Sequence, residues 1–303
     1  MYDIIGDVHG HYDLLVKLLK KLGYQSKEGH YYNPNRKVVF TGDIINRGPQ
    51  IRQTVSLVRA MVEKGAAYAV MGNHELNAIL YHTVDKSGKS LRKKLLRYKL
   101  PLLKTIQAYD KEPGELKETI KWFRQLPLYL DLGEIRVVHG AWSDKGIQTV
   151  SQFMNGESRL KKSFIRTYLN NDELSTSVNT LIKGEEMFMP KDLLVKDDRG
   201  LIQRSFRIKW WEPMRGKTFY DAGFGNRFLL PKYTIPLELV PEIAPYDTEA
   251  PPVFVGHYCL ENKPLIYNGN VCCIDTCITR TGHLAAYRWN GEQKLNAENI
   301  ITI

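Results

Sequence analysis

The sequence of 303 residues lacks any run of about 18 apolar residues free of charge, so no segment is typical of a membrane-spanning helix. It also lacks a positively charged start followed by an apolar core, the pattern of a secretory signal. Its 23 glycines and 14 prolines follow no period, which excludes collagen-like and low-complexity repeats. Core-forming residues are not scarce: 43% of the residues are hydrophobic, which excludes a disordered chain and is typical of a globular protein.

Cysteine is scarce and unevenly placed. The four cysteines all lie in the last 45 residues, at Cys259, Cys272, Cys273 and Cys277. None forms a Cys-x-x-Cys pair, so neither a zinc ribbon nor a redox motif is indicated, and a disulfide framework would be spread along the chain. We therefore expect reduced cysteines that mostly fill the core of a cytoplasmic protein.

Acidic residues are outnumbered. The chain has 43 Lys and Arg against 33 Asp and Glu, a formal net charge of +10, which favours anionic partners such as phosphates or nucleic acid. Residues 86–104 contain eight Lys and Arg and no acid, and a second basic group lies between Arg159 and Arg166. The simplest interpretation of both stretches is a solvated helical face, and a binding surface is the alternative.

The first 80 residues alternate between strand and helix patterns. Apolar strands are predicted at 2–5, 38–40 and 67–71, and amphipathic helices at 11–22, 51–64 and 75–81. This β-α-β-α-β order predicts a largely parallel sheet with crossover helices. Near the end of the chain, strand patterns separated by turn signals predict a second sheet. They lie at 253–255, 271–274 and 284–289.

Two stretches interrupt this plan. Residues 83–130 are predicted to be helical, and residues 151–209 are polar, basic and mixed in pattern. The length of the chain suits one large domain or two small ones. We predict a single domain over residues 1–303, with the two stretches as insertions.

Potential metal ligands stand where the predicted strands end. They are Asp7, His9, Asp43, Asn73, His139 and His257. Open α/β sheets form their binding crevice at the carboxyl ends of the strands, so we expect these side chains to lie close together. The mixture of oxygen and nitrogen donors suits manganese, iron or zinc. Six ligands are too many for one catalytic ion, but they suit two ions that share a carboxylate, an arrangement that promotes phosphoryl transfer.

The motifs around these ligands resemble the phosphoprotein phosphatase branch of the calcineurin-like metallophosphoesterases, in its bacterial type. They are Gly6–Gly10, Gly42–Gly48, Gly72–Glu75, Val138–Gly140 and Gly256–His257. The resemblance in motif order and spacing extends over about residues 3–145 and 210–280, and it does not cover the two insertions. It implies an α/β fold in which a β-sandwich of two mixed sheets is flanked by helices, with a dinuclear metal site at one edge.

The resemblance also implies roles for individual residues. One metal would be bound by Asp7, His9 and Asp43, and the other by Asp43, Asn73, His139 and His257. A water that bridges the two metals would attack phosphorus directly, without a phosphoenzyme intermediate.

Three further residues resemble catalytic groups of this family. His74 resembles the general acid that protonates the leaving oxygen, and Arg47 resembles a clamp on the phosphoryl group, where a planar donor fork fits phosphate. Arg215 lies in a short stretch similar to the family's Arg-Gly-x-Ser/Thr-Phe and is a candidate second phosphate arginine. The alternative for Arg215 is an arginine in a surface turn.

The sequence departs from the family pattern in three places. Asn46 replaces the aspartate that orients the catalytic histidine; its oxygen can still accept the His74 N–H, but it carries no charge to stabilise the imidazolium. We therefore expect retained activity with a lowered pKa of His74. The segments Gly140–Trp142 and His257–Tyr258 also differ from the family, which predicts a changed substrate pocket.

The first functional prediction is a manganese-dependent phosphatase that hydrolyses phosphate monoesters of a phosphoprotein or a small phosphorylated compound. A dinucleoside polyphosphate hydrolase or a nucleic-acid end phosphatase is the alternative, because the basic residues 86–104 could hold a polyanion. The third option is a weakly catalytic, phosphate-binding regulatory protein, for which Asn46 is the only support. The expected partner is an anionic phosphorylated substrate, with nucleic acid as an alternative and no membrane.

Overall fold

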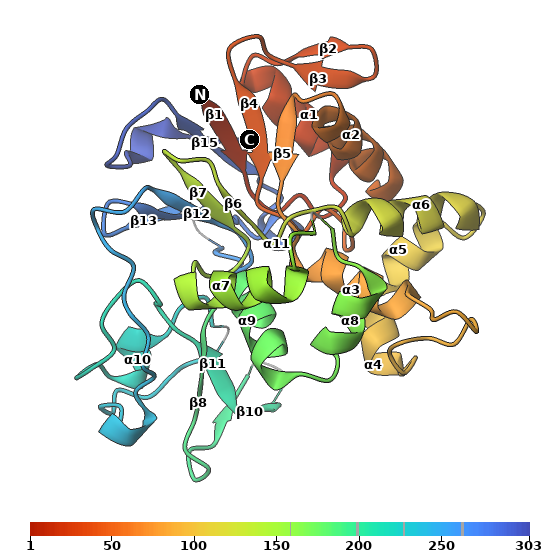
Figure 1. Ribbon diagram of the computed structural model, residues 1–303. Coiled ribbons are helices and arrows are strands. Elements are labelled where there is room, and N and C mark those ends of the chain that lie inside the picture. The colour runs from red at the N-terminus through yellow and green to blue at the C-terminus, as the bar shows by residue number, and fades with distance from the viewer. Residues whose placement is uncertain (158, 198–199, 227, 262–263) are drawn as a thin grey trace.

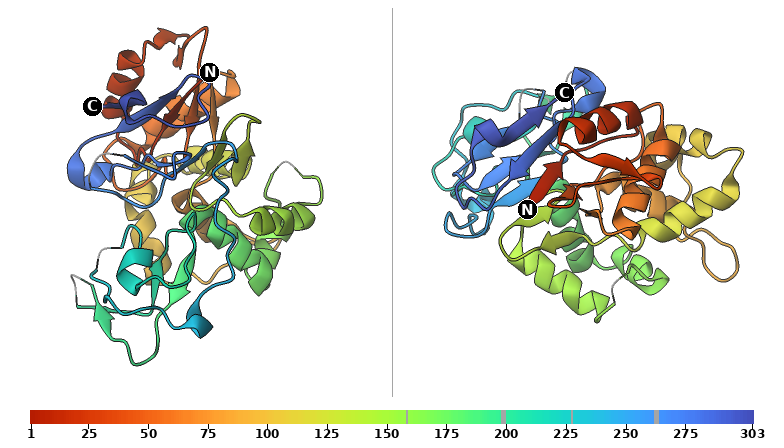
Figure 2. Two further views of the ribbon diagram at one scale, coloured as in Figure 1. Left: turned by 90° about the vertical axis from the view of Figure 1, so that its left-hand side faces the viewer. Right: turned by 90° about the horizontal axis from the view of Figure 1, so that it is seen from above.

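Two five-stranded mixed sheets form the centre of the molecule, with helices on their outer faces (Figures 1 and 2). The computed structural model describes residues 1–157, 159–197, 200–226, 228–261 and 264–303. The predicted α/β sandwich of two mixed sheets with flanking helices is confirmed.

The first sheet has the strand order β16-β15-β1-β4-β5. Its strands are β1 (Tyr2–Ile5), β4 (Lys37–Phe40), β5 (Ala67–Ala69), β15 (Ala285–Trp289) and β16 (Ile300–Thr302). β1, β4 and β5 are parallel, and the chain crosses between them through α1 (Tyr12–Lys21) and α2 (Ile51–Glu63). The predicted β-α-β-α-β unit is therefore confirmed.

The second sheet has the order β13-β14-β12-β7-β6. Its strands are β6 (Tyr129–Asp131), β7 (Arg136–Val138), β12 (Val253–Val255), β13 (Leu265–Tyr267) and β14 (Val271–Cys273). β7, β12 and β14 are parallel, so their carboxyl ends lie at one edge. The prediction that residues 284–289 belong to this sheet was wrong. They form β15, which pairs antiparallel with β1 through Ile4 and Tyr287, because that register places the apolar side of β15 between the sheets.

The core between the sheets is built by alternation along each strand. In β1, Ile4 faces the opposite sheet and packs in a cluster with Val39, Phe254 and Tyr287. Its neighbour Ile5 faces the other way, into the larger cluster beneath α1 and α2. This two-residue period fixes the register, because a slip by one residue would turn the apolar side chains away from both clusters.

The remaining elements surround the sandwich. They are β2 (Gln25–Lys27), β3 (His30–Tyr32), α3 (Asn73–His82), α4 (Leu96–Lys99), η1 (Leu100–Leu102), α5 (Leu103–Ala108), α6 (Pro113–Phe123), α7 (Asp144–Met154), α8 (Lys162–Tyr168), α9 (Asp172–Lys183), α11 (Ile278–Thr281) and η3 (Ala297–Asn299). No helix in the described ranges is both long and apolar enough to cross a membrane.

Residues 184–250 form short elements below the sandwich in the view of Figure 1. They are β8 (Glu186–Phe188), β9 (Val195–Lys196), β10 (Ile202–Gln203), β11 (Ser205–Arg207), α10 (Phe219–Ala222) and η2 (Leu237–Leu239). Side chains from this region form an apolar cluster of their own, which includes Phe206, Ile208 and Phe219. A single domain with insertions stays a prediction.

Candidate metal centre

The six predicted ligands follow strand ends of both sheets. Asp7 and His9 come after β1, Asp43 after β4, Asn73 at the start of α3 after β5, His139 after β7, and His257 after β12. Because these strands are parallel within each sheet, their carboxyl ends converge at one edge of the sandwich. The structure thus brings together the side chains that the motifs single out.

Asp43 lies at the middle of the cluster and is only 2% exposed. Its Oδ2 is 3.7 Å from Nε2 of His9 and 3.7 Å from Nε2 of His74, and its Oδ1 is 3.3 Å from Nε2 of His139. Two ligands of one ion, each about 2.1 Å from it, lie about 3 to 3.5 Å apart. A carboxylate faced by three imidazoles at such distances is therefore placed to hold cations on two sides.

The second group of donors surrounds the Asn73 carboxamide. Its Oδ1 is 2.8 Å from Nδ1 of His257 and 3.2 Å from Nε2 of His139. Asp7 joins this side, because its Oδ2 accepts the backbone N–H of His257 at 3.1 Å. Ligand atoms of Asp43, His139 and His257 all lie within 4.8 Å of one another.

The backbone around the centre is held in left-handed conformations. The φ angles are 45° at His9, 48° at Asp43, 63° at Arg47 and 68° at His257. Such residues cost of order 1–3 kcal/mol each and persist only where the surroundings determine them. Gly256 permits a close approach of the chain to a ligand, since a Cβ there would lie 2.2 Å from Oδ1 of Asp7.

Glu75 organises the Asp43 loop, a role that the sequence analysis did not assign. Its fully buried carboxylate accepts backbone N–H groups from Gly72, Asp43, Ile44 and Ile45 at 2.9–3.2 Å. Burial and the charge of Asp43 raise the pKa of Glu75 to about 7. The one available signal was a glutamate inside the Gly72–Glu75 motif, three residues into α3, where such a side chain can reach back to free N–H groups.

The pKa values of Asp7 and His139 are both raised, as expected where carboxylates lie close together without a cation between them. Burial, with the charge of Asp275, holds the pKa of Asp7 well above its usual range. Burial alone would lower the pKa of His139, but Asp43 and Asp7 raise it to about 10. A buried imidazole that takes up a proton between two carboxylates marks a place where a cation is favoured.

The other two imidazoles are kept neutral. Burial and then His74 lower the pKa of His9 to about 3. Burial and then Arg207 lower the pKa of His257 well below its usual range. A neutral imidazole is the form that binds divalent metals, so His9 and His257 are in the form that a metal ligand needs.

His74 is positioned by two neighbours. The Asn46 amide nitrogen lies 2.6 Å from Nδ1 of His74, and Nη2 of Arg47 lies 3.3 Å from its Nε2. Arg47 can only donate, which leaves the ring proton on Nδ1, and the Asn46 amide meets that proton best with its oxygen toward the ring. The Thr105 hydroxyl lies 2.5 Å from Oδ1 of Asn46. It can form a hydrogen bond with the Asn46 amide in either orientation, because a hydroxyl can both donate and accept. Burial and Arg47 lower the pKa of His74, while Asp43 acts in the opposite direction.

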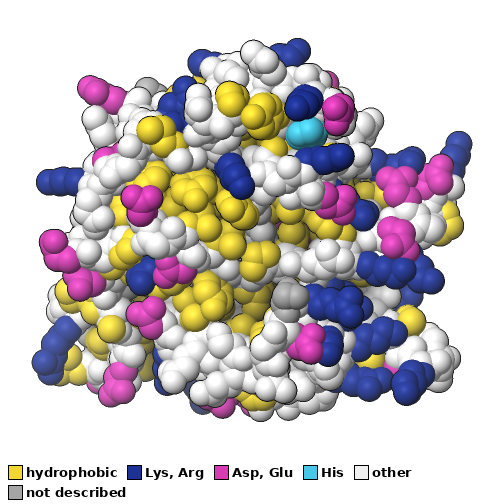
Figure 3. All heavy atoms as spheres, turned by 45° about the horizontal axis from the view of Figure 1, so that its top comes forward, with side chains coloured by type: hydrophobic (Ala, Val, Ile, Leu, Met, Phe, Trp, Pro, Cys, Tyr) yellow, Lys and Arg dark blue, Asp and Glu magenta, His cyan; other side chains and the backbone are white. Residues whose placement is uncertain are grey.

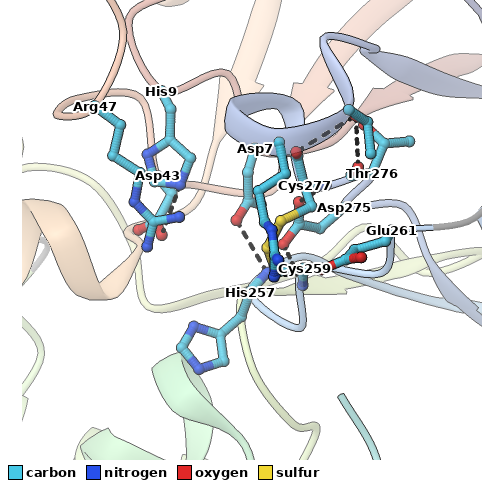
Figure 4. Close-up of a disulfide and its surroundings, with 12 residues drawn as sticks. Asp7, His9, Asp43, Arg47, His257, Cys259, Glu261, Asp275, Thr276 and Cys277 are labelled. Atoms are coloured by element: carbon cyan, nitrogen blue, oxygen red, sulfur yellow. Dashed lines mark hydrogen bonds and ion pairs between the residues drawn. A yellow bond between two sulfur atoms is a disulfide. The ribbon is translucent and has the colours of Figure 1, made fainter. Parts of the chain in front are cut away.

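The two predicted phosphate arginines differ in placement. Arg47 lies beside His9 and Asp43 in Figure 4. Arg215 is exposed, and it makes no hydrogen bond or ion pair with the described residues of the centre. Its predicted role gains no support from contacts, because the turn after Trp211 carries its side chain outward into solvent.

Arg207, which the sequence analysis did not single out, reaches the centre instead. It ends β11, its guanidinium lies 5.9 Å from the ring of Tyr258, and its charge lowers the pKa of His257. Its Nη1 is buried and has no hydrogen-bond partner within the described ranges. No motif could have identified Arg207, because it is one of many basic residues in a mixed polar stretch.

The cysteine prediction was wrong for one pair. Cys259 and Cys277 form a disulfide (Figure 4). Cys272 and Cys273 are reduced and buried, as expected. Cys259 follows β12 and Cys277 follows β14, so two neighbouring parallel strands deliver the pair to one place despite 18 residues of separation. The expected cytoplasmic location stays a prediction.

The disulfide lies next to the metal centre. Asp275 accepts the backbone N–H of Cys259 at 2.6 Å and that of Cys277 at 2.8 Å, and its charge contributes to the raised pKa of Asp7. Figure 4 shows His257 two residues before Cys259, with its ring directed away from the disulfide. The disulfide therefore ties the loop that carries His257 to the loop after β14.

Solved structures of other phosphatases share this fold. A cold-active protein-tyrosine phosphatase of a psychrophilic Shewanella species superposes with a TM-score of 0.50 at 18% identity, over 95% of this chain and 75% of that one. A mutant cold-active protein tyrosine phosphatase gives a TM-score of 0.51 at 17% identity, over 96% and 78%. At these identities the likeness shows the fold alone.

Fold and donor cluster together define a metallophosphoesterase. The chain belongs to the calcineurin-like phosphoesterase family, whose family model matches residues 2–203. This confirms the calcineurin-like family predicted from the motifs.

Curated relatives cover part of the chain. A bis(5′-nucleosyl)-tetraphosphatase PrpE (asymmetrical) from Geobacillus sp. strain WCH70 is 35% identical over 162 residues, which is 48% of this chain and 62% of the relative. A protein of the same name from Halalkalibacterium halodurans is 51% identical over 74 residues, 24% of this chain and 30% of the relative. The chain thus matches less than two-thirds of the length of these relatives.

Proposed function

We propose that this protein is a phosphohydrolase that uses two divalent metal ions, manganese first among the candidates. The observation that carries the proposal is Asp43, one buried carboxylate with His9 and His74 on one oxygen and His139 on the other. A shared carboxylate with imidazole donors on each side is the arrangement that two neighbouring ions need. When bound, the ions would acidify water and neutralise charge on the phosphoryl group.

The chain's own residues would bind the substrate and move a proton. Arg47 and Arg207 stand on two sides of the centre, and both can donate to phosphoryl oxygens. His74, with Nε2 3.7 Å from the Asp43 carboxylate, would hold the proton that the leaving oxygen takes. The lowered pKa of His74 makes it a readier proton donor and shortens the pH range in which it stays protonated.

For the substrate, we propose a dinucleoside polyphosphate. The sequence analysis ranked phosphate monoesters first and dinucleoside polyphosphates as the alternative. The names of the PrpE relatives, which are 35% and 51% identical to this chain over the parts that match, favour the alternative. A basic surface supports it: Figure 3 shows Lys and Arg side chains gathered on the side where Figure 1 places α4 to α6. Such a surface attracts a highly charged anion.

Two measurements test this function. The first is turnover of p-nitrophenyl phosphate with manganese, which we expect Asp43→Asn to lower by more than about a hundredfold, the loss that even an outer partner of a metal site can cause. Asp192→Asn removes an exposed carboxylate and is the matched control. Equal activity of wild type and Asp43→Asn would contradict the metal proposal and favour the weakly catalytic regulatory protein.

The second measurement compares diadenosine tetraphosphate, a phosphopeptide and a 5′-phosphorylated oligonucleotide as substrates. The proposal predicts the highest kcat/KM for the tetraphosphate. A preference for the phosphopeptide would favour the first prediction from the sequence, a phosphatase that hydrolyses phosphate monoesters. A preference for the oligonucleotide, with a steep loss of binding as salt is raised, would indicate a nucleic-acid end phosphatase.

A further inference from the structure

The first turn of α5 lies against the turn that carries Asn46 and Arg47. Oγ1 of Thr105 is 2.5 Å from Oδ1 of Asn46, and the Lys104 ammonium donates to the backbone oxygen of Arg47 at 2.5 Å. Both residues of α5 belong to residues 83–130, one of the two predicted insertions, and Lys104 is the last cation of the basic stretch 86–104. Two consecutive residues of this helix therefore contact two consecutive residues of a loop at the metal centre.

These contacts stabilise a part of the loop that the Glu75 carboxylate does not bind. Glu75 accepts backbone N–H groups as far along the loop as Ile45. Asn46 and Arg47 follow, and both have left-handed backbone conformations, with φ angles of 69° and 63°. Residues other than glycine keep such conformations where the surroundings determine them. The contacts from α5 are therefore part of what holds Asn46 and Arg47 in place.

The helix that makes these contacts is itself anchored. Thr105 and Tyr109, which directly follows α5, are each 1% exposed. The hydroxyl of Thr119 in α6 lies 3.3 Å from the hydroxyl of Tyr109. The Arg52 guanidinium of α2 lies 5.8 Å from the Tyr109 ring, and it forms an ion pair with Glu115 of α6. These contacts join α5 and α6 to α2, so Thr105 has a fixed position beside the loop.

The side chain of Asn46 needs a partner at each end of its amide, because it is fully buried. An aspartate presents accepting oxygens in either orientation, whereas an amide has one accepting end and one donating end. One end meets Nδ1 of His74 at 2.6 Å, and the other meets the Thr105 hydroxyl. Loss of the hydroxyl would leave one end of the amide unsatisfied and favour other positions of the Asn46 side chain.

We propose that Thr105 is a positioning residue for His74, which acts through the Asn46 amide. The inference rests on the function proposed above, in which His74 gives its proton to the leaving oxygen. Thr105 does not itself transfer the proton. It keeps the amide against Nδ1 of His74, so that Nε2 stays directed toward Asp43, 3.7 Å away. The predicted insertion thus supports an asparagine that stands where the motif resemblance implies an aspartate.

The test uses the whole chain loaded with manganese and the variant Thr105→Val, which keeps the shape of the side chain and removes the hydroxyl. We expect kcat for an alkyl phosphate to fall about tenfold, a part of the roughly 10²- to 10⁴-fold that a proton donor contributes. The kcat for p-nitrophenyl phosphate should stay within about twofold of wild type, because its leaving group departs as a stable anion.

Two further variants control this result. Thr105→Ser restores the hydroxyl and should restore kcat for the alkyl phosphate. Thr119→Val removes the hydroxyl of another buried threonine in residues 83–130 and should leave both substrates unchanged. If urea unfolding shows that Thr105→Val does not fold, Thr105→Ala removes the same hydroxyl without the second methyl group and takes its place.

A double-mutant cycle tests whether Thr105 acts through Asn46. In Asn46→Ala, the added Thr105→Val should change kcat for the alkyl phosphate by less than about twofold. Equal losses on the two substrates would indicate a merely structural role and would overturn the proposal. It would also be overturned by an unchanged kcat in Thr105→Val, by a loss that persists in the Asn46→Ala background, or by a failure of Thr105→Ser to restore kcat.

The tautomer of neutral His74 gives a readout that does not depend on turnover. In the zinc-loaded protein, a nitrogen NMR spectrum of the histidine rings should show the proton on Nδ1 in wild type, Thr105→Ser and Thr119→Val. Thr105→Val should show a mixture of Nδ1 and Nε2 protonation, and an unchanged spectrum would overturn the proposal. If wild type hydrolyses neither phosphate, the proposed function is wrong, and this spectrum alone then decides the positioning role.

Discussion

Residues 2–82 and residues 184–250 are built in opposite ways. The first region contains three parallel strands with α1 to α3 and the β2–β3 hairpin. It supplies Asp7, His9 and Asp43 from buried loops and Asn73 from the start of α3. The second consists of strands of two or three residues with a small apolar cluster of its own. It also leaves large apolar side chains in solvent: Phe188 is 74% exposed and Leu229 is 85% exposed.

This difference suggests that the first region holds the metal ligands, whereas the second region contacts the substrate. Ligands must be held within a few tenths of an ångström, which strand ends in a packed sandwich provide. From the second region, Arg207 reaches the centre from the end of a short strand. We therefore expect substitutions in the first region to change turnover, and substitutions in the second to change substrate preference or nothing.

The largest effect is expected for His74→Asn, in the first region. Loss of the proton donor should lower kcat by about 10²- to 10⁴-fold for an alkyl phosphate, whose leaving group needs a proton. The loss should be smaller for p-nitrophenyl phosphate, whose leaving group departs as a stable anion. His283→Asn, at an exposed histidine, is the control. Equal losses on the two substrates would contradict the proton-donor role and leave a role in metal binding.

The next effect concerns His257, the ligand delivered directly after the second region. Cys259→Ser opens the disulfide to Cys277, which closes a loop of 18 residues and should stabilise the fold by about 3 kcal/mol. Urea unfolding should show this loss, and wild type in reductant should match the variant. Four free thiols in the unreduced wild-type protein would contradict the disulfide and restore the original prediction of reduced cysteines.

A smaller effect is expected for Asn46→Asp, again in the first region. A carboxylate next to Nδ1 of His74 should raise its pKa, so the proton donor stays protonated to higher pH. The alkaline limb of the pH–rate profile should move upward by about one unit, equivalent to about 1.4 kcal/mol. Asn170→Asp adds the same charge at an exposed position and should leave the profile unchanged. An unshifted profile in Asn46→Asp would contradict the coupling between these residues.

The smallest effect is expected for Phe188→Ser, on β8 of the second region. The side chain is largely exposed, so the free energy of unfolding should change by no more than about 0.5 kcal/mol. Phe206→Ala on the paired strand β11 removes a side chain that is 2% exposed and should cost about 3–5 kcal/mol. A drop in tetraphosphate turnover with Phe188→Ser would place substrate on this surface and weaken the contrast between the regions.

Features that depend on local pattern could be predicted from the sequence. Apolar runs located the strands, and Asp and His directly after them located the ligand cluster, because parallel strands end at a common edge. The pairing of strands that are distant in the chain was harder to predict from the sequence. β15 pairs with β1 rather than with the second sheet, and the apolar pattern of a strand does not show which distant strand it pairs with.

The contacts that sequence missed depend on tertiary placement. Glu75 satisfies a loop that lies 30 residues earlier in the chain, and Cys259 meets Cys277 only because β12 and β14 are neighbours. Arg207 belongs to a short strand whose position depends on how residues 184–250 pack, and no local pattern reveals that packing.

Metal content tests the central claim most directly. The chain should be stripped with chelator, reloaded with manganese, passed through a desalting column and analysed for manganese per chain. Six donor residues, among them the shared Asp43, predict two ions per chain in wild type and fewer in Asp43→Asn. One ion or none in the fully active wild-type enzyme, or two ions retained by Asp43→Asn, would contradict the account.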